Sequence, residues 1–148
     1  MISNYRLQSK TLFLTYPKCP ILPEDAFDIL KTKVPIDKAV VGQEHHQDGD
    51  FHLHAYLALE KKVHIRDPHK LDLHTYHGKY ESARDTVKVV RYCTKEGYNV
   101  FQHNIDAAAL IEAREKHRRV IAREMLKQPL HKLIEGQEEL VFGYKRLK

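Results

Sequence analysis

Residues 51–60 read FHLHAYLALE, and this alternation of apolar and polar side chains predicts a β-strand with two different faces. Successive side chains of a strand point to opposite sides, so the apolar members share one face: Leu53, Ala55, Leu57 and Leu59. His52, His54 and Tyr56 share the other face. We expect the first face to be core and the second to carry a site. Two imidazoles about 7 Å apart along a strand can bind one small cation when a third ligand joins them.

The turn before this strand predicts the third ligand. Residues 39–46 form another strand-like run, and residues 47–50, QDGD, are a strong hairpin signal between the two. A two-residue loop at 48–49 would pair Glu44 with Leu53 on the core face. A three-residue loop, with Gly49 left-handed and making a bulge, would instead pair Glu44 with His52. We predict the bulged turn, which places the carboxylate beside both imidazoles.

The predicted metal ligands are therefore Glu44, His52 and His54. His45 and His46 are adjacent competitors, and alternation sends His46 to the same face as Glu44. This mixed set of nitrogen and oxygen ligands with open positions suits Mn²⁺ or Mg²⁺, and less decisively Zn²⁺ or Fe²⁺. Such a cation can polarise a phosphoryl oxygen. The sequence therefore predicts an electrophilic centre suited to phosphodiester chemistry.

Residues 83–96 predict a helix with a core stripe and a basic stripe. Residues 82–85, SARD, have the form of a capping box, and Gly97 is placed to end the helix. The basic stripe holds Arg84, Lys88, Tyr92 and Lys95, and the core stripe holds Ala83, Val87, Val90 and Thr94. A tyrosine can attack phosphorus as a phenolate and leave a covalent phosphotyrosine. A phenol ionises only near pH 10, so the nucleophile needs a metal, a base or a cation nearby. Lys88 and Lys95 lie one turn to either side of Tyr92.

The remaining pattern predicts an α+β fold. The expected order is a strand at 12–16, a helix at 23–33, strands at 39–46 and 51–63, the helix at 83–96 and a last strand at 100–102. This order is that of a split β-α-β sandwich with a central antiparallel sheet, the ferredoxin-like or RRM-like arrangement. From residue 104 the composition changes, which predicts C-terminal helices at 105–127 and 130–141. We expect one domain over residues 1–103 and a helical extension over 104–148.

Composition sets the class of protein. The chain has 148 residues, 25 Lys and Arg against 20 Asp and Glu, a net charge of +5 and a pI near 9.1. This balance favours a polyanionic partner such as nucleic acid. No run approaches the roughly 20 apolar residues of a membrane span, and the N-terminus has no signal-peptide core. The two cysteines indicate no disulfide framework. We expect an intracellular protein with no membrane partner.

Three motifs in order resemble those of the replication-initiator (Rep) proteins of circular single-stranded DNA viruses, members of the His-hydrophobe-His (HUH) endonuclease superfamily. They are FLTYPKC at 13–19, HLH at 52–54 and YCTK at 92–95, and the resemblance spans about residues 10–100. It implies that the first motif helps to bind single-stranded DNA, and we expect Thr15 and Tyr16 to be the members of the motif that face the DNA. Lys88 is a further DNA-binding candidate.

The resemblance also assigns chemical roles. The paired histidines and Glu44 would hold the divalent metal, Tyr92 would be the nicking nucleophile, and Lys95 would assist at the phosphate or the metal. Residues 66–73 faintly resemble the segment after the histidines in geminivirus Reps, with a shorter loop following, so no individual role is carried over there. The chain has no phosphate-binding loop of the form GxxxxGK[ST], so ATP-driven unwinding is not expected of it. It is either the endonuclease portion of a larger protein or a separate short Rep.

The implied function is a metal-dependent, sequence-specific single-stranded DNA endonuclease and strand-transferase that initiates rolling-circle replication through a 5′-phosphotyrosine intermediate. Its expected cofactor is Mn²⁺ or Mg²⁺, and its expected substrate is a stem-loop replication origin. Host replication proteins and further copies of the full-length chain are additional partners that the resemblance allows. For a eukaryotic virus the location would be the host nucleus.

Two alternatives remain open from the residues. The first is a non-catalytic RRM-like module, which would display aromatic side chains for base stacking on its central strands. The second is a metal phosphodiesterase that activates water and forms no adduct. No metal-ligand partner is predicted for the remaining histidines, which are His64, His69, His74, His77, His103, His117 and His131.

Overall fold

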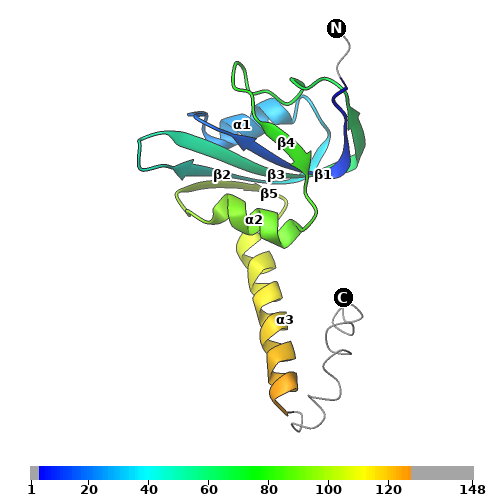
Figure 1. Cartoon of the computed structure of the whole chain (residues 1–148), viewed down its shortest axis with the longest axis vertical. Coiled ribbons are helices and arrows are strands. Elements are labelled where there is room, and N and C mark those ends of the chain that lie inside the picture. The colour runs from blue at the N-terminus through cyan, green and yellow to red at the C-terminus, as the bar shows by residue number, and fades with distance from the viewer. Residues whose placement is uncertain (1–3, 128–148) are drawn as a thin grey trace. The chain divides into compact units, whose positions relative to one another are not determined.

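A computed structural model describes residues 4–127 of the chain and confirms the α+β class. Five strands form one antiparallel sheet in the order β4-β1-β3-β2-β5, and three helices accompany them (Figure 1). The strands are β1 (Leu7–Tyr16), β2 (Ile36–His45), β3 (Phe51–Ile65), β4 (Lys79–Ser82) and β5 (Asn99–His103). The helices are α1 (Pro23–Leu30), α2 (Thr86–Thr94) and α3 (Ala107–Lys127).

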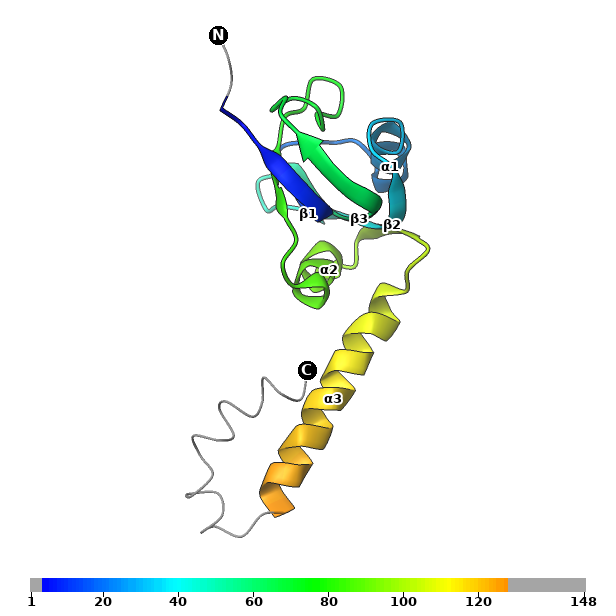
Figure 2. The ribbon, with the colours of Figure 1, turned by 90° about the vertical axis from the view of Figure 1, so that its right-hand side faces the viewer.

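Helices α1 and α2 lie on opposite faces of the sheet (Figure 2). The face toward α1 carries the main core, and the four apolar side chains predicted to share it are at most 1% exposed: Leu53, Ala55, Leu57 and Leu59. Helix α1 contributes Phe27 and Leu30 to this core. It begins at Pro23 as predicted, but it ends at Leu30 rather than near residue 33.

The face toward α2 is a second, smaller core rather than a site throughout. Val40 of β2 and Tyr56 of β3 pack there with Val90 and Cys93 of α2 and are almost completely buried. Histidine 54, two residues before Tyr56 on the same face, is 4% exposed. The face that alternation predicted to be a site is therefore partly core, around Tyr56. The histidines of β3 that share this face lie nearer the β2–β3 hairpin.

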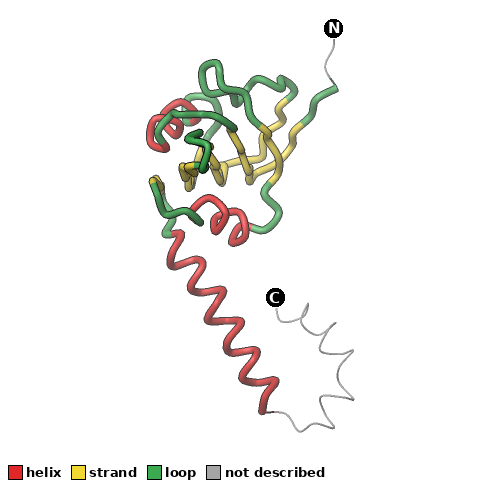
Figure 3. Tube along the Cα trace, turned by 60° about the vertical axis from the view of Figure 1, so that its left-hand side comes forward, coloured by secondary structure: helices red, strands yellow, loops and turns green. Residues whose placement is uncertain are grey.

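The structure contains a strand that the sequence did not predict. Strand β4 pairs with β1 at one edge of the sheet, and the strands lie together in one layer (Figure 3). Because Ser82 belongs to this strand, the predicted capping box is wrong. The N-cap of α2 is Asp85, whose side chain accepts a hydrogen bond from the backbone N–H of Lys88 at 3.2 Å. Strand β1 also begins at Leu7, earlier than predicted.

The C-terminal part of the described chain is helical, as predicted. Helix α3 covers most of the interval 105–127, and the predicted helix at 130–141 lies outside the described residues. The chain divides into two compact units between Ile111 and Glu112, while the boundary after residue 103 stays a prediction. Over residues 4–127, no helix is both long and apolar enough to span a membrane.

Candidate active site

The β2–β3 hairpin has the register that brings Glu44 to the histidine face. Glu44 pairs with His52 and His45 pairs with Phe51. The backbone N–H of His46 donates to the carbonyl of Asp50 at 2.9 Å, which leaves the three-residue loop 47–49 with Gly49 at a φ of +91°. The predicted three-residue turn is thus confirmed, and its left-handed residue is the glycine.

The carboxylate of Glu44 is the centre of a polar cluster. Its Oε2 lies 2.7 Å from Nε2 of His54 and 3.3 Å from Nζ of Lys95. Its Oε1 lies 3.4 Å from Nε2 of His46, whose ring packs on that of His52 with 3.8 Å between centroids. The structure therefore brings the predicted ligands together with Lys95, and it adds His46, the competitor that alternation had placed on this face.

Burial and neighbouring charges set the protonation of these groups. Burial favours a raised pKa for Glu44, but the hydrogen bonds to His54 and Lys95 outweigh it and hold the pKa below its ordinary value. The pKa of Lys95 is raised, because its contacts with Glu44 outweigh a desolvation effect in the other direction. Burial lowers the pKa of His54 despite the adjacent carboxylate. At neutral pH, Glu44 and Lys95 are charged and His54 is a neutral imidazole, the form that binds a metal.

Tyr92 projects from the last turn of α2 onto this cluster. Its ring meets the ring of His54 edge-on at 4.8 Å and that of Phe13 at 5.7 Å, and Nζ of Lys95 lies 4.0 Å from its centroid. The residue is nevertheless 42% exposed. A tyrosine that touches the histidine cluster and is open to solvent is suitably placed to attack a bound phosphodiester. Phe13 was missed as a site residue, although it shares the strand face of Thr15 two residues away.

A glycine lets α2 approach the sheet this closely. A Cβ on Gly42 would lie 1.7 Å from the carbonyl oxygen of Cys93. Cys93 directly follows Tyr92 and lies two residues before Lys95, so the contact fixes the backbone that carries both side chains. The sequence signal was a glycine inside an apolar strand, which often marks a close backbone approach.

The predicted DNA-binding residues separate into two groups. Thr15 pairs with His54 across the β1–β3 ladder and lies half-buried on the same face. Tyr16 does not face DNA, and that interpretation is wrong. Its side chain is 0% exposed, and its hydroxyl donates to the carbonyl of Leu71 at 2.6 Å. Adjacent residues of a strand point to opposite faces, so Thr15 and Tyr16 could not both reach one ligand.

Lys88 lies beside Tyr92 on the wall of a surface pocket of about 690 Å³. The pocket lies along β1, β4 and α2, and aromatic and basic side chains contribute to its wall. These residues are Phe13, Tyr80, Arg84, Lys88 and Tyr92. Aromatic faces beside cations are the surface that stacks and neutralises single-stranded nucleic acid. Glu81 and Asp85 also line the pocket, so it is not uniformly basic.

The residues around Glu44 fit a small divalent cation. The site combines a carboxylate, a neutral imidazole at His54 and the rings of His46 and His52, which is the donor chemistry such an ion requires. Nδ1 of His54 is buried and has no hydrogen-bond partner among the described residues. In this structure the ammonium group of Lys95 supplies positive charge at Oε2 of Glu44, an oxygen that is a candidate metal ligand.

A second group of histidines lies in the loop between β3 and β4. His69 and His77 each contact the carboxylate of Asp72, and one ligand atom from each of the three residues lies within 4.8 Å of the others. The expectation that the remaining histidines lack a metal-ligand partner is therefore wrong for these two. Their approach depends on the path of the loop between β3 and β4, which residue spacing did not predict.

Comparison with known proteins gives one consistent result. Residues 5–106 match the family described as Geminivirus Rep catalytic domain. The chain is 43% identical over 97 residues to the replication-associated protein A of Bean yellow dwarf virus, which covers 64% of this chain and 33% of that protein. It is 38% identical over 95 residues to replication-associated protein A of Chloris striate mosaic virus, covering 62% and 32%. The chain thus spans about a third of the length of these curated relatives.

Proposed function

The chain belongs to the Geminivirus Rep catalytic domain family, and we propose that it nicks and rejoins single-stranded DNA with Tyr92 as nucleophile and a divalent metal as cofactor. The observation that carries the proposal is the 4.8 Å contact between the rings of Tyr92 and His54, in which His54 is also hydrogen-bonded to Glu44. The contact joins a phenol suited to a covalent phosphate adduct to the group suited to hold a cation.

In the proposed nicking step, the phenolate oxygen of Tyr92 attacks the scissile phosphorus in line. A bond forms between that oxygen and phosphorus, the bond from phosphorus to the 3′ oxygen breaks, and the released 3′ oxygen takes a proton. The 5′ phosphate remains on Tyr92. Attack by another 3′ hydroxyl reverses these bond changes, so joining needs no ATP because the adduct conserves the bond energy. The released 3′ end would prime rolling-circle synthesis.

The surrounding side chains have two proposed supporting roles, which are metal binding and stabilisation of negative charge. Glu44, His52 and His54 would hold Mn²⁺ or Mg²⁺, with His46 as a further candidate ligand. When bound, such an ion polarises a phosphoryl oxygen and neutralises developing charge. Lys95, 4.0 Å from the Tyr92 ring centroid, stabilises the phenolate and the phosphate through its positive charge.

Substrate binding is proposed to use the pocket beside Tyr92. Phe13, Tyr80 and Lys88 offer two stacking faces and a cation for unstacked bases and phosphates. Thr15, on the same sheet face as His54, is a further proposed contact. The substrate would be the stem-loop origin of a circular single-stranded genome. Action in a host nucleus, host replication proteins and self-association of the full-length protein belong to the same proposal.

A covalent-adduct experiment tests this function. The protein is incubated with Mn²⁺ and a library of stem-loop oligonucleotides labelled at the 3′ end, and the products are separated on a denaturing protein gel. We expect label to migrate with the wild-type protein and to be lost with EDTA or in Tyr92→Phe. The matched control is Tyr98→Phe, because Tyr98 is 60% exposed and stacks with His45, outside the nicking group.

Each alternative gives a different result in the same gel. Cleaved oligonucleotide without protein-bound label, preserved in Tyr92→Phe, would indicate a water-activating phosphodiesterase. Binding without cleavage across the library would indicate a non-catalytic nucleic-acid-binding module. Loss of the adduct in Tyr98→Phe to the same degree as in Tyr92→Phe would contradict the assignment of the nucleophile.

A further inference from the structure

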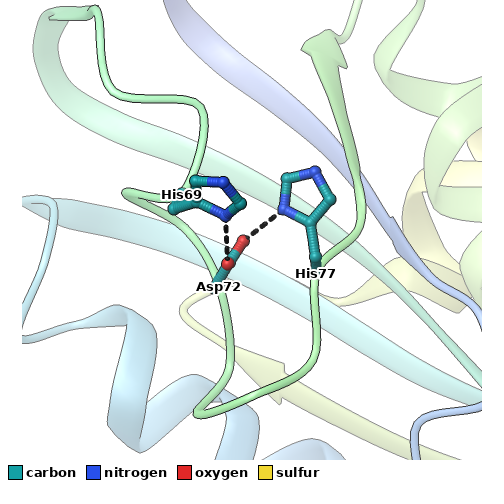
Figure 4. Close-up of side chains that lie close together, drawn as sticks. All are labelled: His69, Asp72 and His77. Carbon is teal, nitrogen blue, oxygen red and sulfur yellow. Dashed lines mark hydrogen bonds and ion pairs between the residues drawn. The ribbon is translucent and has the colours of Figure 1, made fainter.

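The loop at residues 66–78, between β3 and β4, holds two histidines around one carboxylate. Nδ1 of His69 lies 2.8 Å from Oδ2 of Asp72, and Nδ1 of His77 lies 2.7 Å from Oδ1 (Figure 4). The two rings are 4.7 Å apart between centroids. These residues belong to a segment separate from the Glu44 cluster on β2 and β3.

The carboxylate of Asp72 is held in place by the fold, whereas the imidazoles approach it from solvent. The hydroxyl of Tyr80 donates to its Oδ1 at 2.6 Å. The neighbours Leu71 and Leu73 are 0% exposed in the main core. The Asp72 side chain is 15% exposed, against 66% for His69 and 50% for His77. One ligand is thus anchored, and two are free to adjust by small side-chain rotations.

We propose that His69, Asp72 and His77 form a zinc site. Two imidazole nitrogens and one carboxylate oxygen are three protein ligands of a tetrahedral Zn²⁺ ion, with water in the fourth position, whereas Mg²⁺ and Ca²⁺ prefer oxygen ligands. One ligand atom from each residue already lies within 4.8 Å of the others, and neighbouring ligand atoms on such an ion are about 3.3 Å apart, so shifts of at most about 1.5 Å bring the three to the spacing that zinc requires.

Asp72 connects the proposed zinc site to the pocket through its hydrogen bond with Tyr80. One carboxylate oxygen of Asp72 would bind the ion with one ring nitrogen of each histidine, while Oδ1 would keep the hydrogen bond from Tyr80. The Tyr80 ring lines the pocket that contains Tyr92, and it packs against Tyr16 with 5.6 Å between centroids. Zinc would therefore fix the loop and one aromatic wall of the proposed DNA surface. Zinc binding itself does not depend on the nicking function.

Calorimetric titration with ZnCl₂ alone tests the site. The variants are His69→Ala/His77→Ala, the control His64→Ala at an exposed histidine just before the loop, and Glu44→Gln to weaken the nicking site. We expect the double variant to lose one zinc equivalent or to bind it at least about tenfold more weakly, since even outer-shell changes typically cost 10–100-fold. His64→Ala should match wild type, and Glu44→Gln should keep the loop equivalent.

Limited trypsin digestion gives a second measurement that does not require activity. Lys70 is an exposed cleavage site inside the loop. Zinc should slow cleavage after Lys70 in wild type and in Glu44→Gln, but not in the double variant. Equal zinc stoichiometry and affinity in wild type and the double variant would overturn the proposal, as would cleavage that zinc leaves unchanged in wild type. A protein that fails to form the Tyr92 adduct could still pass both measurements, so the two proposals fail independently.

Discussion

A methyl group on Gly42 would lie 1.7 Å from the carbonyl oxygen of Cys93, so the backbones of β2 and α2 touch at this point. The atom in the way belongs to the backbone and cannot rotate aside. Since Cys93 follows Tyr92 directly, the distance between the sheet and the proposed nucleophile depends on the absence of a side chain at residue 42.

Gly42→Ala should therefore damage both stability and nicking. We expect unfolding to become easier by about 1–3 kcal/mol, as in other overpacked sites. We also expect nicking to fall by more than about tenfold, since displacements near 1 Å can cost about 10²-fold. Chemical denaturation and single-turnover nicking measure the two effects.

The matched control is Gly97→Ala. A Cβ there meets nothing within 4 Å, although the φ of +58° makes alanine less favourable. It should cost about 1 kcal/mol through backbone conformation alone and leave nicking within about twofold. A Gly42→Ala protein that nicks at the wild-type rate would contradict the positioning role.

Tyr16→Phe tests the correction to the predicted DNA-binding set. The change removes the hydroxyl that donates to the Leu71 carbonyl in the core. Leaving that carbonyl without its donor should destabilise the protein by about 1–2 kcal/mol, while DNA affinity stays within about twofold. Denaturation and fluorescence anisotropy with a single-stranded oligonucleotide measure these quantities. A large affinity loss at unchanged stability would restore Tyr16 as a DNA contact.

The sequence predicted those features that depend on local periodicity. Alternation in residues 51–60 identified the core side chains of β3, and the turn residues 47–49 identified the Glu44–His52 pair. Strand β4 was missed because its four residues, KYES, carry little apolar alternation and pair with β1 as an edge. A short edge strand is specified by its backbone partner rather than by its own pattern.

Contacts between distant segments were also outside the reach of local patterns. The approach of Phe13 to Tyr92 depends on how α2 packs on β1, and the meeting of His69 with His77 depends on the path of a loop. Tyr16 was different, because the period of two already excluded it from the face of Thr15. The prediction for Tyr16 was wrong because it assigned DNA binding to neighbouring residues of the motif together, without separating the residues that point to opposite faces of the strand.

Lys88→Ala should weaken binding to single-stranded DNA of any sequence. If Lys88 contacts one phosphate, the slope of log K against log salt should become shallower by about 0.7. Anisotropy titrations at several salt concentrations measure the slope. Lys31→Ala is the control, because Lys31 caps α1 on the opposite face and its side chain is 53% exposed. An unchanged slope in Lys88→Ala would remove this residue from the proposed DNA surface.

Lys95→Ala should move metal affinity and nicking in opposite directions. The ammonium lies 3.3 Å from Oε2 of Glu44 and competes with a cation for that oxygen. Its removal should tighten Mn²⁺ binding by about fivefold, which corresponds to the ~1 kcal/mol of a solvated pair at this range. Nicking should fall by about 10²-fold, because a charge that stabilises the transition state is lost.

Calorimetry with Mn²⁺ and single-turnover nicking at saturating Mn²⁺ separate these effects. Lys95→Arg should recover part of the nicking rate, because it keeps the positive charge. Weaker Mn²⁺ binding together with slower nicking in Lys95→Ala would instead indicate a merely structural role for the lysine.

The burial of His54 predicts that the stability of the folded protein depends on pH. Its pKa in the folded protein lies below the ordinary value of 6.5, chiefly because burial disfavours the charged ring. Below pH 6.5 the unfolded chain therefore binds a proton at this residue that the folded chain does not, and stability falls as the pH decreases toward the folded pKa. The slope from this one group cannot exceed about 1.4 kcal/mol per pH unit.

Denaturation in EDTA between pH 5 and 7.5 should show this loss in wild type and a smaller loss in His54→Gln, whose side chain stays neutral. His64→Gln, at an exposed position, should follow the wild-type slope. The window lies above both the ordinary pKa of Glu44 and its lowered value in the folded protein, so that carboxylate is mostly ionised in both states and contributes little to the slope. Equal slopes in wild type and His54→Gln would mean that His54 is protonated equally in both states. Below pH 6.5 the buried ring would then be mostly a cation beside Glu44, and there it would have to lose a proton before it could bind a metal.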